Sequence, residues 1–97
     1  METSELVRLA NQALGDGYIA KPMMILPDVI TVDKMDKGKP KPVATIRPVT
    51  GVDGTVHVNI IEPLTLEDTA AAHRIASQYH AAGLMVIGVD VPPYGFH

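Results

Sequence analysis

The sequence predicts an α+β fold: a single two-layer sandwich in which two helices lie on one face of a mostly antiparallel sheet of about four strands. Three observations lead to this prediction. Apolar residues recur at helical spacing in residues 3–15 and 64–83. Apolar and polar residues alternate in 42–49 and 54–62, as in half-buried strands. Residues 84–91 are apolar on both sides, so the predicted order is α-β-β-β-α-β.

The first helix is expected in the segment TSELVRLANQALG. Thr3 or Ser4 can cap its start, Glu5 suits the positive end of the helix dipole, and Gly15 can close it. One face of this helix is apolar and is expected to face the core: Leu6, Leu9, Ala10, Ala13 and Leu14.

Residues 17–33 are rich in apolar β-formers, but prolines interrupt them. Pro22 and Pro27 each lack the N–H that a central strand needs. We therefore expect an edge strand, or two short pieces over 17–26 and 28–33. Met23 and Met24 within this segment are expected to pack in the core, as methionines commonly do.

The two cleaner strands, 42–49 and 54–62, are expected to form a hairpin with a three-residue loop from Gly51 to Asp53. Their alternation fixes the pairing of the strands. Ile46 should lie opposite Val58 on the core side, which places Arg47 opposite His57 on the other side. A slip by one residue would bring Arg47 to the core side, which burial forbids.

The second helix is expected to begin at Thr65, where Asp68 follows three residues later in a capping-box pattern, and to stop at Gly83. The strand over 84–91 should then be an interior strand. Because strand–helix–strand connections are right-handed crossovers, residues 84–90 should run parallel to 55–61. Residues 92–97, with the sequence PPYGFH, are expected to form an extended C-terminal tail.

Composition supports one globular domain over residues 1–97, with 46% hydrophobic and 20% charged residues. The chain has no cysteine, which excludes disulfides and thiolate chemistry. A net charge of −3 provides no general attraction for polyanions. The N-terminus lacks the pattern of a secretory signal and no apolar run is long enough to cross a bilayer, so we expect a cytoplasmic protein.

The stretch DKMDKGKPKP, residues 33–42, is the most unusual in composition, with four lysines against two aspartates. The lysines could bind phosphates or an acidic protein surface: Lys34, Lys37, Lys39 and Lys41. The same residue types are also those of a solvated hairpin loop, which is the interpretation we favour. There is no arginine for bidentate phosphate binding and no phosphate-loop glycine pattern.

No catalytic or cofactor motif is present, and we predict neither a cofactor nor a metal site. His73 and His80 are seven residues apart on the second helix, about 10 Å along its axis, which is too far for one metal. Four polar residues should share the outer face of the sheet: Thr45, Arg47, His57 and Asn59. They could form a polar solvent face, an anion pocket, or an active site in which His57 acts on a substrate held by Arg47.

Tyr94 and Phe96 lie in the proline-stiffened tail, where they could fold back on the sheet or dock on a partner. The main functional hypothesis is a small non-catalytic protein that binds another protein or its own copy as a homodimer. Small inhibitors and accessory subunits, including viral ones, have this profile. The expected contacts are the edge strand near residues 22–32, the tail, and the polar residues Arg47, His57 and Asn59. An enzyme using His57 and a nucleic-acid-binding module using the lysine loop, residues 34–41, are the alternatives.

Overall fold

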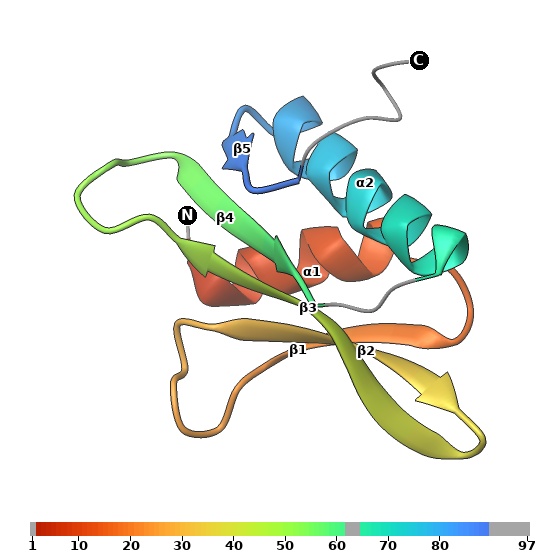
Figure 1. Cartoon of the computed structure of the whole chain (residues 1–97). Helices are drawn as coiled ribbons and strands as arrows, with labels where there is room; N and C mark the ends of the chain where they lie inside the picture. Colours follow the sequence, from red (N-terminus) through yellow and green to blue (C-terminus); the bar gives the residue numbers. More distant parts are fainter. Residues whose placement is uncertain (1, 62–64, 90–97) are drawn as a thin grey trace.

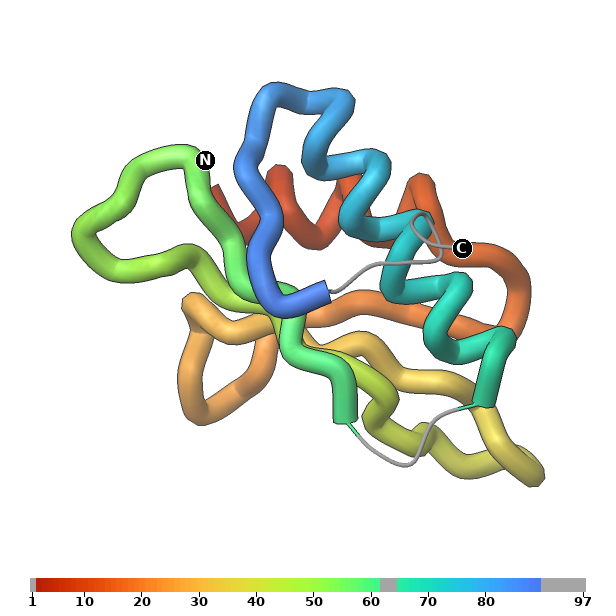
Figure 2. Tube along the Cα trace, turned by 45° about the horizontal axis from the view of Figure 1, so that its top comes forward, coloured from red at the N-terminus to blue at the C-terminus, as the bar shows by residue number. Residues whose placement is uncertain are grey.

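The computed structural model describes residues 2–61 and 65–89 and confirms the predicted α+β fold (Figure 1). The predicted first β region is split, so the sheet has five strands. The elements follow in the order α1 (Thr3–Ala13), β1 (Tyr18–Pro22), β2 (Ile30–Asp36), β3 (Lys39–Pro48), β4 (Thr55–Ile60), α2 (Leu66–Ala81) and β5 (Met85–Ile87). Both helices cover the same face of the sheet, as Figures 1 and 2 show from two directions.

The sheet is a meander of four antiparallel strands, β1 to β4, to which β5 adds in parallel. The predicted register between β3 and β4 is confirmed: Ile46 pairs with Val58, and Arg47 pairs with His57. The connection is longer than predicted, because the strands end at Pro48 and begin again at Thr55.

The core lies between the inner face of the sheet and the two helices. It is built mainly from aliphatic side chains: Leu6, Leu9, Ile30, Val32, Ile46, Val56, Val58 and Ile75. Tyr79 of α2 is fully buried, and its hydroxyl donates a 2.7 Å hydrogen bond to the carbonyl oxygen of Leu6 in α1. The two helices are thereby joined to one another as well as to the sheet.

The ends of α1 differ from the sequence prediction. The N-cap residue is Glu2, which makes no capping hydrogen bond through its side chain, so neither Thr3 nor Ser4 is the cap. The helix ends before Gly15, and its last carbonyl, that of Ala13, accepts a 3.1 Å hydrogen bond from Arg74 Nε. A side chain from α2 therefore replaces the local glycine cap.

The predicted interior strand over 84–91 is wrong in position. The described strand β5 has three residues, and it is an edge strand in which Met85 and Ile87 are 63% and 43% exposed. The reason is topological: β3 already occupies one side of β4, so a crossover can add only to its outer side. The parallel pairing with β4 is confirmed, since Thr55 lies opposite Met85. The tail over 92–97 is outside the described residues.

Candidate protein-binding surface

The connection between β1 and β2, residues 23–29, is the most unusual surface feature, and we call it the apolar loop. Met24, Ile25 and Leu26 are three consecutive large apolar residues, and they are 96%, 86% and 55% exposed. Met24 was expected in the core, and that prediction is wrong. Soluble proteins seldom leave neighbouring large apolar side chains in water unless a partner covers them.

Two backbone hydrogen bonds give the apolar loop a defined shape. The N–H of Met23 donates to the carbonyl oxygen of Val29, and the N–H of Val29 donates to that of Leu26, both at 2.8 Å. The second bond closes a four-residue turn whose second position is Pro27, a residue favoured there because its φ is already fixed. These bonds define the backbone at the base of the loop and at the turn that ends it.

The connection between β3 and β4, residues 49–54, projects from the same end of the sheet. In Figures 1 and 2 both connections extend to the left, away from the hairpin turn between β2 and β3. Val52 is a further large exposed apolar residue in this connection. We call this part of the molecule the loop end. It gathers four of the large apolar side chains that the described surface exposes to water.

A groove of about 380 Å³ lies where these two connections meet the sheet. Its lining is largely aliphatic, with one guanidinium and one carboxylate: Leu26, Pro27, Asp28, Val29, Arg47, Pro48 and Thr50. Arg47, predicted on the outer face of the sheet, therefore belongs to this groove. His57 is not among the lining residues, although it is paired with Arg47 across the strands.

The outer face of the sheet carries the four predicted residues in adjacent positions. Thr45 lies opposite Asn59, and Arg47 lies opposite His57. His57 is half-buried, and the backbone at Gly88 lies close to its ring. Any larger residue at position 88 would clash with the ring, because its Cβ would lie 2.6 Å from Nε2. The enzyme alternative based on His57 and Arg47 remains a prediction.

The free edge of β1 is closed to a further strand by a side chain. Asn11 of α1 accepts from the N–H of Ala20 and donates to the carbonyl oxygen of Ala20, each at 2.9 Å. The side chain therefore takes the hydrogen bonds that an added strand would use. The expectation of two short pieces over 17–26 and 28–33 is confirmed in outline by β1 and β2, and β1 is at the sheet edge. An edge strand near residues 22–32 is wrong, because this range holds the apolar loop and the start of β2, which pairs on both sides.

The lysine-rich segment forms the hairpin between β2 and β3, and Lys37 and Gly38 are its two turn residues. Both have positive φ, at 54° and 79°, as in the type I′ turns of tight hairpins. Lys39 and Lys41 are exposed on the returning strand. Nucleic-acid binding through these lysines remains a prediction.

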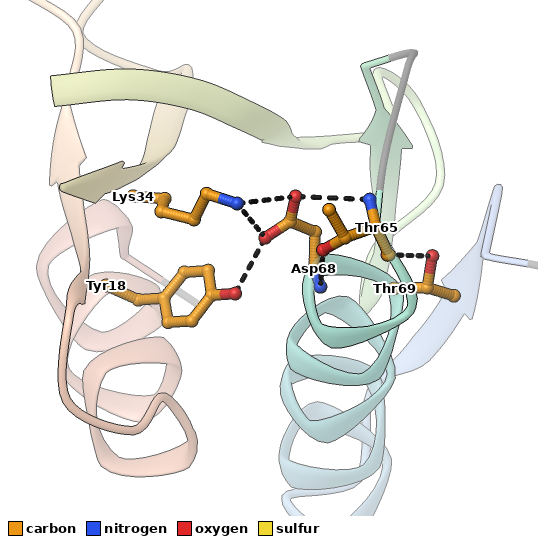
Figure 3. A network of polar contacts seen from close by, with 5 residues as sticks. All are labelled: Tyr18, Lys34, Thr65, Asp68 and Thr69. Atoms are coloured by element: carbon orange, nitrogen blue, oxygen red, sulfur yellow. Dashed lines mark hydrogen bonds and ion pairs between the residues drawn. The ribbon is translucent and has the colours of Figure 1, made fainter. Parts of the chain in front are cut away.

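Lys34 differs from the other lysines, because it belongs to a hydrogen-bonded network around Asp68 (Figure 3). The carboxylate of Asp68 is only 3% exposed and accepts from Lys34 Nζ at 3.1 Å and from the hydroxyl of Tyr18 at 2.7 Å. The predicted capping box is present as well, since Thr65 Oγ1 accepts from the N–H of Asp68 and the Thr65 N–H donates to its carboxylate. Lys34 thus fastens the sheet to the start of α2.

The network determines how its members ionise. Burial alone would raise the pKa of the Asp68 carboxyl, but the hydrogen bonds from Tyr18, Lys34 and Thr65 together outweigh burial and lower this pKa. Burial and the hydrogen bond to the carboxylate raise the pKa of Tyr18. Asp68 is therefore held as a carboxylate at neutral pH.

The two helix histidines have different surroundings, since His73 is buried and His80 is exposed. Within the described ranges, no three His, Asp or Glu side chains are grouped closely enough to hold a metal ion. Nor is any helix in those ranges long and apolar enough to cross a membrane.

Sequence reasoning missed the exposure of the apolar loop, although the signal was present. Pro22 and Pro27 bracket the run MMIL, and two prolines five residues apart prevent that run from pairing as a strand.

Comparisons of the chain with protein-family models, curated proteins and solved structures gave no match.

Proposed function

We propose that this chain is a small non-catalytic binding protein that docks its apolar loop, residues 23–29, into another protein. The single observation that carries this proposal is the exposure of Met24, Ile25 and Leu26 on a hydrogen-bonded loop. In protein-binding surfaces a few clustered residues supply most of the affinity, and a loop with three adjacent exposed side chains can act in this way.

The energetics are consistent with such a role. Burying one large apolar side chain contributes about 1.5–3 kcal/mol, so three adjacent side chains can supply a substantial part of the free energy of binding. The loop is already held by its two backbone hydrogen bonds, so less conformational entropy is lost when it docks. An inhibitor or an accessory subunit would use the surface in the same manner.

Tyr94 and Phe96, in the tail outside the described residues, are proposed as a second contact with the same partner. Substituting both with alanine should weaken the complex several-fold if the tail contributes an anchor of ordinary size.

Site-specific photo-crosslinking tests the loop directly. A benzophenone amino acid replaces Ile25 in one variant and Lys39, at the opposite end of the sheet, in a matched control. In extract of the source cells, position 25 should yield a discrete crosslinked protein that position 39 does not yield. Adding Met24→Ser and Leu26→Ser to the position-25 variant should remove that product. Identical products from both positions, or none from position 25, would contradict the proposal.

A further inference from the structure

We propose that the groove beside the apolar loop binds a segment of another protein in which a large aliphatic residue is followed by glutamate or aspartate. This inference rests on the proposed function and specifies the chemistry of the partner. It follows from the lining of the groove, which combines an aliphatic wall with one arginine that has no ion-pair partner in the described part of the chain.

The aliphatic wall favours an apolar side chain. Leu26, Pro27 and Val29 form it on the side of the apolar loop, and Pro48 forms it on the side of β3. A volume of about 380 Å³ is near the lower limit for sites that hold small organic ligands. The groove therefore suits one or two residues of an extended segment, and a longer stretch of the partner would have to lie along the loop.

Arg47 favours a carboxylate. The lysines on β1 and β2 already have ion-pair partners, unlike Arg47 on β3. Lys21 Nζ lies 3.6 Å from a carboxylate oxygen of Asp33, and Lys34 Nζ lies 3.1 Å from one of Asp68. The guanidinium of Arg47 offers several donors in one plane and can bind a carboxylate with two parallel hydrogen bonds. Charge complementarity thus selects an acidic residue beside the aliphatic one.

Asp28 also lines the groove, and its place in the chain has a local explanation. It is the third residue of the turn closed by the Val29 N–H, directly after Pro27, and aspartate is common in such turns. Its carboxylate would repel an acidic residue placed beside it. The acidic residue of the partner should therefore lie at the Arg47 side of the groove, which gives the segment one direction of binding.

A titration with matched dipeptides tests this inference. The probes are acetyl-Leu-Glu-amide, acetyl-Leu-Gln-amide and acetyl-Gly-Glu-amide, added to isotope-labelled protein and followed by amide NMR shifts. Their concentrations extend into the millimolar range, where ligands of this size are expected to bind. The leucine–glutamate probe should shift the amide signals of the non-proline residues within 26–29 and 47–50, and each of the other two should bind at least about fivefold more weakly.

Two variants locate the effect. Arg47→Gln should bind the glutamate and glutamine probes equally, whereas Lys41→Gln, which removes the same charge from the other end of β3, should discriminate as the wild type does. Equal binding of all three probes, shifts elsewhere, or no shift would overturn the inference. Sedimentation of the protein alone should show no concentration-dependent association. Association that Arg47→Gln abolishes would instead identify a second copy as the occupant. Each of these failures leaves the crosslinking result at Ile25 unaffected.

Discussion

The two ends of the sheet use their side chains in opposite ways. At the end near the start of α2, Tyr18 and Lys34 donate to Asp68, so a buried carboxylate has its partners within the molecule. At the loop end, Ile25 and its neighbours remain in water and Arg47 has no ion pair among the described residues. The first end has a buried carboxylate whose partners all lie within the molecule, and the loop end has three adjacent exposed apolar side chains beside an arginine without an ion pair in the described ranges.

This difference indicates which end contributes to stability and which is free to evolve for binding. A buried carboxylate is costly without its donors, so the network constrains the residues around it. Exposed loop residues contribute little to the free energy of folding, so selection can act on their shape and chemistry. Substitutions at the two ends should therefore have opposite consequences for stability and for binding.

The largest expected effect is at Asp68. Replacement by alanine removes the acceptor of the Thr65 N–H, which is one half of the capping box, and leaves Lys34 and Tyr18 without their acceptor. We expect a loss of about 3 kcal/mol in the free energy of unfolding, measured by urea denaturation. The matched control is Asp28→Ala at the loop end, where an exposed carboxylate should contribute within about 0.5 kcal/mol. Equal effects of the two substitutions would contradict the difference drawn between the two ends.

The network should also contribute to the loss of stability at acid pH. Because the folded protein lowers the pKa of Asp68, the unfolded chain takes up this proton first as the pH falls. The contribution of Asp68 to stability is thus complete above its ordinary pKa of about 3.9 and is lost as the pH falls through the lower pKa of the folded state. In urea denaturation, the stability difference between wild type and Asp68→Asn should narrow over that range. A difference that stays constant would show that Asp68 titrates alike in both states.

Regular features of the fold could be predicted because each depends on neighbours in the sequence. The alternation around Ile46 and Val58 was sufficient to fix the register of β3 and β4, since a slip would have buried Arg47. The capping box of Thr65 and Asp68 could be recognised from their spacing. The capping box depends only on nearby residues. The strand register depends on the rule that a charged side chain stays out of the core, which only one pairing of β3 and β4 satisfies.

The features that escaped prediction depend on contacts between distant segments. Lys34 was assigned to a solvated loop, and only the fold brings Asp68, far along the chain, within hydrogen-bonding distance. Similarly, the side chain of Asn11 binds the backbone of Ala20 at the edge of β1, and no local sequence pattern predicts this contact. The exposure of Met24 was misjudged for another reason: an apolar composition favours the core on average, but the flanking prolines kept this run out of the sheet.

The smallest effect on stability is expected at the loop end, where Ile25→Ser should change the free energy of unfolding by no more than about 0.5 kcal/mol. Ile25 is largely exposed, so its replacement creates no cavity and leaves no buried polar group unpaired. The matched control is Ile75→Ser in the core, which should destabilise the protein by several kcal/mol because it combines a cavity with an unpaired hydroxyl. Urea denaturation measures both variants. If Ile25→Ser proved strongly destabilising, the apolar loop would be packed against the protein's own surface and could not be the part held ready for a partner.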